Sequence, residues 1–220
     1  MKFFSALVAA TTLAQAVSAH YIFSQITAGG QTTGAAIRQP RNNSPVESAS
    51  SNDLRCNASP SAASSTLNVA SGSSFSFKLD NTFYHPGPGA VYLGQVPSGQ
   101  TAASWDGSGA NWFKIAEFGA KFNPFGFLLD GQSTVAGTIP SAVQAGQYLL
   151  RVEQIGLHVA GSPQWYISCA QINVTGGGSG SPAKVSIPGY VSASDPGLAV
   201  NIYNPVPTSY KVPGPAVWRG

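Results

Sequence analysis

The chain has 220 residues, a formal net charge of +3 and only 9% charged residues. This balance provides no basic patch for nucleic acid or anionic lipid, and no stretch approaches the roughly 20 apolar residues of a membrane-spanning helix. We therefore expect neither a nucleic-acid nor a membrane partner. With 25 glycines and 16 prolines, the composition fits an extracellular β protein with long loops.

Residues 1–19 have the pattern of a secretory signal peptide. Lys2 supplies an early positive charge, an apolar stretch follows, and Val17 and Ala19 are small residues at positions −3 and −1 of a cleavage site. Cleavage there makes His20 the first residue of a secreted protein. Its free α-amine and its ring Nδ1 can then chelate one metal ion, and these nitrogen ligands suit Cu(II). If cleavage falls elsewhere, His20 is incidental.

Short strands dominate the rest of the chain. Residues 73–79 alternate between apolar and polar, and residues 146–153 and 164–174 read as two further strands. Turn-forming runs separate them, among them residues 85–89 and 123–126. No stretch shows helical periodicity with caps. The pattern predicts an all-β protein, an antiparallel β-sandwich of the immunoglobulin or fibronectin kind with long loops.

The glycine-rich run 176–182 resembles an interdomain linker. The segment after it, residues 183–220, is too small to fold alone without disulfides or metal. We therefore expect a surface loop followed by a tail that packs back on the sandwich. Residues 20–220 are then one catalytic domain with no appended carbohydrate-binding module.

The chain has two cysteines, Cys56 and Cys169. Because their number is even and a secreted protein is in an oxidising compartment, a disulfide between them is favoured over metal binding by their thiols. N-glycosylation motifs begin at Asn42, Asn57 and Asn173. A proline follows each of the first two motifs and is expected to impair glycosylation, and the third lies in a predicted strand.

Further candidate ligands and catalytic groups lie at strand ends. His85, in a turn after a strand, would add a third nitrogen to the two of His20 and leave open positions on the metal. His158 directly follows a predicted strand, and the alternative interpretation is that it is a buried histidine bonded to the backbone. Gln164 and Tyr166 are two apart and share one face of a strand. The alternative interpretation is that Gln164 is an exposed strand amide and Tyr166 is an aromatic residue of the core.

Five motifs occur in order along the chain: HY at 20–21, NTFYHPGP at 81–88, GLH at 156–158, QWYISCAQI at 164–172 and PGPAVW at 213–218. Together they resemble the fungal lytic polysaccharide monooxygenases of auxiliary activity family 9, formerly glycoside hydrolase family 61. The resemblance covers everything after the signal peptide.

This resemblance implies one copper ion per chain. His20, through its amine and Nδ1, and His85, through Nε2, would form a histidine brace around it. Tyr166 would lie in the axial position, with its hydroxyl weakly coordinated.

The resemblance also implies roles around the metal. His158 and Gln164 would hydrogen-bond activated oxygen species, and Tyr210 would stack on a glucose ring at a flat substrate face. Cys56–Cys169 would match the long-range bridge of the family. Many members have a second disulfide, for which this chain lacks the cysteines.

The implied activity is oxidative cleavage of β-1,4-glucan, in cellulose or hemicellulose, at C1 or C4. It would use O2 or H2O2 and an external electron donor, either a small reductant or a redox enzyme, and the enzyme would be a monomer. One rival is a hydrolytic endoglucanase, which needs two paired carboxylates, and no such motif is present. The other is a non-catalytic protein that binds copper or polysaccharide.

Overall fold

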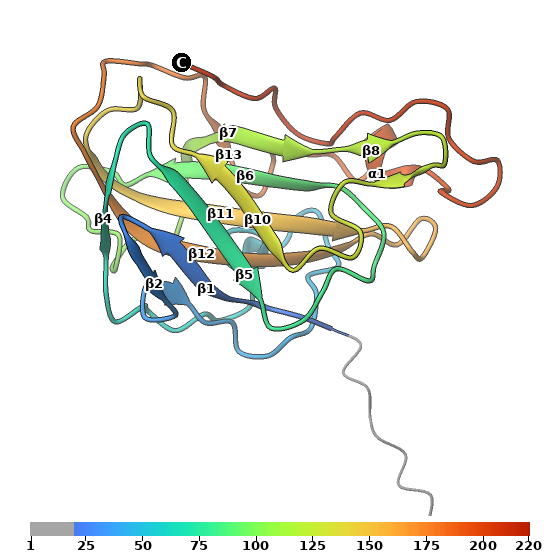
Figure 1. Ribbon diagram of the computed structural model, residues 1–220, viewed down its shortest axis with the longest axis horizontal. Coiled ribbons are helices and arrows are strands. Elements are labelled where there is room, and N and C mark those ends of the chain that lie inside the picture. Colours follow the sequence, from blue (N-terminus) through green and yellow to red (C-terminus); the bar gives the residue numbers. More distant parts are fainter. Residues whose placement is uncertain (1–19) are drawn as a thin grey trace, which may run out of the picture.

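A computed structural model describes residues 20–220 and shows two facing antiparallel sheets (Figure 1). The predicted signal peptide lies outside the described residues. The smaller sheet has the order β10 (Thr134–Thr138), β5 (Ser74–Leu79), β1 (Phe23–Ala28) and β2 (Gln31–Thr33). The larger has the order β13 (Val185–Ser186), β7 (Ala110–Phe118), β6 (Gly89–Gln95), β11 (Gly146–Gly156), β12 (Gln164–Thr175) and β3 (Ile37–Arg38). β4 (Leu67–Ala70) adds to β12 in parallel, and β8 (Ala120–Lys121) pairs with β9 (Gly126–Phe127).

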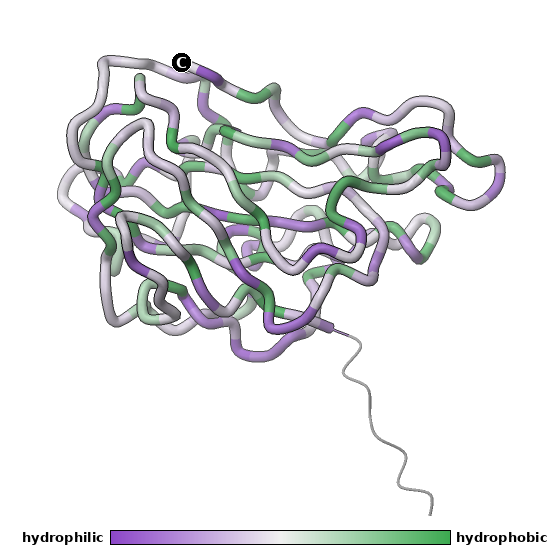
Figure 2. The backbone as a smooth tube through the Cα atoms, viewed as in Figure 1, coloured by the Kyte–Doolittle hydropathy of each residue, from purple (hydrophilic) through white to green (hydrophobic). Residues whose placement is uncertain are grey.

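Alternating side chains build the core between the two sheets. In β5, Phe75, Phe77 and Leu79 are buried, while Ser74 and Lys78 face solvent. Because successive side chains of a strand point to opposite faces, this alternation closes one face of the small sheet against the large one. In Figure 2, hydrophobic and hydrophilic segments alternate at short intervals along the chain. The predicted β-sandwich is confirmed.

The large sheet is buried on both faces, because the C-terminal tail covers its outer side. Glu153 in β11 accepts hydrogen bonds from Arg151, at 2.7 Å, and from the tail residue Tyr190, at 2.6 Å. The buried Lys114 of β7 donates to the carbonyl of Pro213 at 2.9 Å. These contacts explain why β11 is buried almost continuously instead of alternating. They also show how the tail packs back on the sandwich.

The disulfide between Cys56 and Cys169 is present and joins residues 113 apart in sequence. Closing a loop of that length stabilises the fold by about 5 kcal/mol in the chain-entropy estimate. It ties the 3-10 helix η1 (Asn52–Leu54) and the loop after it to β12. The side chain of the neighbouring residue Asn57 is buried and donates to the carbonyl of Ile167 at 3.1 Å. Because this side chain is buried, a glycan on its nitrogen would require the Asn57 side chain to leave that position.

One short helix departs from the purely β expectation. α1 (Pro196–Ala199) has a single turn, with proline at its first position and Asp195 as its N-cap. The Asp195 side chain accepts from the backbone N–H of Gly197 at 2.9 Å, which satisfies an otherwise unpaired donor of that turn. Within residues 20–220 no helix is long and apolar enough to cross a membrane.

Several loops meet at one end of the sandwich. The described chain begins there, at the lower right of Figure 1, and the connection between β11 and β12 extends from the same end. α1 and the red segment that follows it also lie at this end. Residues far apart in sequence are therefore brought close together.

Candidate active site

His20 lies just before β1, where two side chains hold the start of the described chain. The Asn43 amide donates to the carbonyl of His20 at 3.3 Å. The Asp80 carboxylate accepts from the N–H of Ile22 at 3.0 Å, and its own N–H donates back to the Ile22 carbonyl. The backbone at His20 and at Ile22 is thus anchored to two separate segments of the chain.

His85 is held by a turn that lies directly against β11. The N–H of Ile155 donates to the carbonyl of Pro88 at 2.9 Å. A Cβ atom on Gly87 would lie 1.7 Å from the Ile155 carbonyl oxygen, so only glycine fits this approach. The turn residues seen in the sequence therefore fix the position of the histidine.

The rings of His20 and His85 lie close together, with their planes inclined by 49°. Their centroids are 6.2 Å apart. Two imidazole nitrogens that bind one metal ion from opposite sides, each at about 2.0–2.1 Å as for zinc, place their ring centroids about 6 Å apart. No group of three or more His, Cys, Asp or Glu side chains among residues 20–220 could hold a metal. The pair fits one metal ion if the α-amine of His20 supplies the third nitrogen.

His158 stacks on His85. The two ring centroids are 3.8 Å apart and the planes are inclined by 14°. Gly156 makes this possible, because a Cβ there would lie 3.1 Å from His158 Nδ1 and 3.3 Å from His85 Cβ. Burial, followed by the nearby charges of His85 and His20, lowers the pKa of His158 and so favours the neutral imidazole. Nδ1 is buried and has no hydrogen-bond partner in the described part of the chain.

Tyr166 and Gln164 complete the cluster from β12. The Tyr166 ring centroid lies 6.0 Å from that of His20 and 5.6 Å from that of His85, and its hydroxyl donates to Gln164 Oε1 at 3.0 Å. Gln164 Nε2 in turn donates to Glu47 at 3.2 Å. Burial raises the pKa of Tyr166, so the phenol keeps its proton and remains a donor.

The structure thus brings together five residues that the sequence singled out, namely His20, His85, His158, Gln164 and Tyr166. Tyr210 lies in the C-terminal tail, and its stacking role at a substrate face stays a prediction. It is partly buried, its ring lies edge-on to Phe127 at 5.2 Å, and its hydroxyl donates to the carbonyl of Gly197 at 2.9 Å.

Two residues that the sequence analysis missed contact the cluster. Tyr203 is 56% exposed, and its hydroxyl donates to the carbonyl of His158 at 3.2 Å. Glu47 orients the Gln164 amide, although the two residues are 117 apart in sequence. Neither lies in a motif, so local sequence carried no signal for them.

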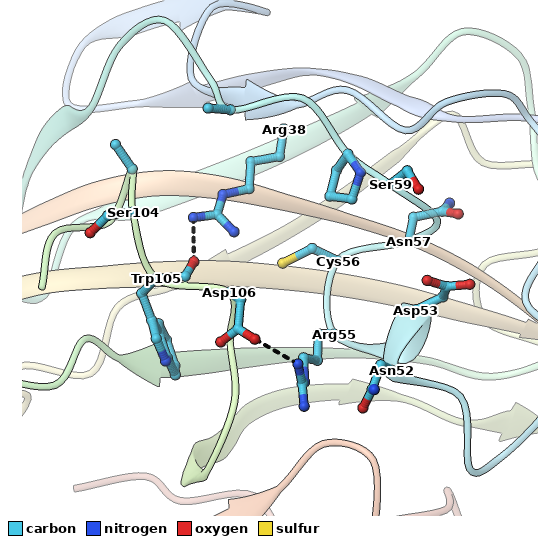
Figure 3. A pocket seen from close by; sticks show the side chains of 13 residues that line it. Arg38, Asn52, Asp53, Arg55, Cys56, Asn57, Ser59, Ser104, Trp105 and Asp106 are labelled. Atoms are coloured by element: carbon cyan, nitrogen blue, oxygen red, sulfur yellow. Dashed lines mark hydrogen bonds and ion pairs between the residues drawn. The ribbon is translucent and has the colours of Figure 1, made fainter.

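A separate cavity of about 380 Å³ lies beside the disulfide (Figure 3). Arg38 donates there to the carbonyls of Ala102 and Trp105, and Arg55 forms an ion pair with Asp106 at 2.8 Å. These arginines hold loops together, and no residue that lines the cavity belongs to the histidine cluster.

The structure thus places a partly exposed histidine pair, backed by a tyrosine and an amide, at one end of a β-sandwich. Residues 20–210 match the sequence profile of Auxiliary Activity family 9 (formerly GH61). The chain belongs to this family of lytic polysaccharide monooxygenases, whose members are copper-dependent oxidoreductases. They cleave polysaccharides oxidatively, with an external reductant and O2 or H2O2.

Individual relatives can be aligned with nearly the whole of this chain. AA9 family lytic polysaccharide monooxygenase H of Malbranchea cinnamomea is 53% identical over 220 residues, which cover 94% of this chain and 96% of the relative. A Podospora anserina relative, lytic polysaccharide monooxygenase E, is 49% identical over 96% of this chain and 73% of its own length. The crystal structure of a cellulose-active polysaccharide monooxygenase from M. thermophila superposes with a TM-score of 0.81 at 33% identity, covering 91% of this chain and all of that one.

Proposed function

We propose that this chain is secreted, begins at His20 after signal-peptide cleavage, and acts as a monomeric single-domain enzyme on β-1,4-glucan. It would oxidise C1 or C4 of the sugar with O2 or H2O2 and electrons from a small reductant or a redox enzyme. The observation that carries this proposal is the 6.2 Å separation of the His20 and His85 rings at the exposed end of the sandwich. One copper ion between them would be bound by the His20 amine and both imidazoles.

The residues around the histidine brace would exchange a proton with the oxidant and hydrogen-bond to it. Copper, when bound, supplies the one-electron chemistry that activates the oxidant. Because Nδ1 of His158 is buried, a proton exchanged with the open face would pass through its Nε2. Tyr166 and Glu47 fix the amide of Gln164 from two sides, which leaves its second N–H to donate to an oxygen species.

The exposed apolar residues support a polymer as substrate. Tyr84 adjoins His85, Val159 adjoins His158, and Tyr203 bonds the His158 carbonyl, and all three are exposed. An aromatic surface around the site suits a polysaccharide chain or crystal face, on which sugar rings can stack. The similarity to the cellulose-active monooxygenase from M. thermophila supports cellulose as the substrate of this chain.

Product analysis tests this function. Copper-loaded and metal-free protein that begins at His20 is incubated with cellulose, with and without ascorbate, and the released oligosaccharides are analysed by mass spectrometry. Oxidised ends should form only with both copper and reductant. Unoxidised oligosaccharides released without reductant would support the hydrolase instead, and copper binding without any release would support a non-catalytic protein.

Changing His158 or Gln164 to alanine should separate oxygen handling from metal binding. Neither is expected to touch the metal, so copper affinity should stay within the roughly 10–100-fold range of changes that outer-shell residues cause. Oxidative cleavage should fall much further, because these groups act on the oxidant. Calorimetry gives the affinity and chromatography gives the oxidised products. Variants that cleave at the parent rate would leave both residues with only structural roles.

The two tail tyrosines should respond differently to substitution. Tyr203→Ala should weaken binding to cellulose about 2- to 10-fold, through loss of an exposed stacking ring, and leave the melting temperature nearly unchanged. Tyr210→Ala should lower the free energy of unfolding by about 2–3 kcal/mol, because its ring packs on Phe127. Cellulose pull-down and thermal melting distinguish them. Loss of cellulose binding in Tyr210→Ala alone would place Tyr210, and not Tyr203, at the substrate face.

A further inference from the structure

Gln154 is a buried amide close to the histidine pair. It lies near the end of β11, has no exposed surface, and pairs with Tyr166 of β12 in the sheet ladder. A buried amide destabilises a protein unless its polar atoms are hydrogen-bonded. The partners of Gln154 therefore indicate what this polar residue does in an otherwise apolar core.

Both partners belong to segments that carry the histidines. The Tyr21 hydroxyl donates to Gln154 Oε1 at 2.6 Å, and Gln154 Nε2 donates to the carbonyl of His85 at 2.9 Å. Since the carbonyl can only accept, the amide nitrogen must face His85 and the amide oxygen must face Tyr21. The orientation of Gln154 is thus unambiguous.

The two hydrogen bonds link opposite sheets of the sandwich. Tyr21 directly follows His20 and leads into β1 of the small sheet, whereas the His85 turn leads into β6 of the large sheet. The Tyr21 ring also packs on Tyr166, with ring centroids 4.3 Å apart. Gln154 is therefore placed between the two backbone segments that carry the histidines.

We propose that Gln154 is a positioning residue, which holds the His20 and His85 segments at the separation that copper needs before the metal binds. This inference rests on the proposed copper function. Ligands held in place beforehand lose less conformational freedom on binding, so the amide raises copper affinity without touching the metal. Gln154 differs in this from Gln164, whose proposed partner is the oxidant.

Three single variants and the double variant Gln154→Met/Tyr21→Phe test the proposal in protein that begins at His20. Gln154→Met keeps the length of the side chain and removes both hydrogen bonds, and Tyr21→Phe removes only the first. The matched control is Gln171→Met in β12. Gln171 is likewise a buried strand glutamine, but its amide bonds the backbone of Ala63 and Ser65. Copper affinity by calorimetry, the Cu(II) electron paramagnetic resonance spectrum and the melting temperature of the metal-free protein are compared.

We expect Gln154→Met to weaken copper binding about 10- to 100-fold and to alter the Cu(II) spectrum, as loss of a residue that orients a ligand does. Tyr21→Phe should show a smaller loss of copper affinity. The double variant should bind copper no more weakly than Gln154→Met, because Gln154→Met already removes the hydrogen bond to Tyr21. Gln171→Met should melt at a lower temperature but bind copper like the parent.

Parent-like affinity and spectrum in both Gln154→Met and Tyr21→Phe would overturn the inference and leave Gln154 with a packing role. Should Gln154→Met not fold, Tyr21→Phe alone decides the outcome, because it keeps the ring that packs on Tyr166. A parent protein that begins at His20 and binds no copper would refute the proposed function instead.

Discussion

Replacement of His85 by alanine is expected to abolish both tight copper binding and oxidative cleavage. The imidazole supplies the only proposed nitrogen ligand from outside the first residue, and its loss leaves a two-nitrogen chelate. Copper affinity should therefore fall by more than the roughly 10–100-fold that outer-shell changes cause. Copper titration by calorimetry and chromatography of oxidised oligosaccharides measure the two effects.

The metal-free His85→Ala protein should remain folded. His85 is partly exposed, and the ring nearest to it is the stacked ring of His158, with centroids 3.8 Å apart. Loss of one such ring contact should lower the free energy of unfolding by about 1 kcal/mol. His158→Ala is the control, because it removes the same stack and leaves the brace in place. A His85→Ala protein that unfolds readily and still binds copper tightly would assign His85 a structural role.

Retention of a single residue ahead of His20 is expected to abolish tight copper binding, as His85→Ala does. With Ala19 attached, the nitrogen of His20 is part of a peptide bond and no longer a free amine, so the chelate loses one of its donors. Copper affinity should fall by more than about 100-fold, again beyond the range of outer-shell changes.

The measurement compares two preparations, one that begins at His20 and one that retains Ala19, by calorimetry and by the Cu(II) spectrum. Their metal-free melting temperatures should agree, because the contacts of Asn43 and Asp80 hold the backbone around His20 in both. Equal copper affinity in the two preparations would exclude the amine as a ligand.

The strands could be predicted from the sequence where side chains alternate. The expected strand 73–79 corresponds to β5 (Ser74–Leu79), and 164–174 to β12 (Gln164–Thr175). β11 extends to Gly156, three residues beyond the prediction, and this extension contains Gln154. A glutamine inside a sandwich interrupts the apolar pattern, and only its partners on other segments explain it.

The site could be predicted where its residues lie in local motifs. His20, His85, His158, Gln164 and Tyr166 do, and they lie together. Residues that reach the site through long-range contacts could not be found in this way. Which of the tail tyrosines faces solvent depends on how residues 200–212 pack against Phe127 and His158, and periodicity does not describe such an irregular segment.

The most direct test of copper binding is one titration of the purified protein, after its intact mass has been determined. The account predicts a mass that corresponds to a chain beginning at His20, and one tightly bound Cu(II) ion per chain with a spectrum of nitrogen ligation. A protein that begins at His20 and binds no copper, or binds it equally well after His85→Ala, would contradict the account.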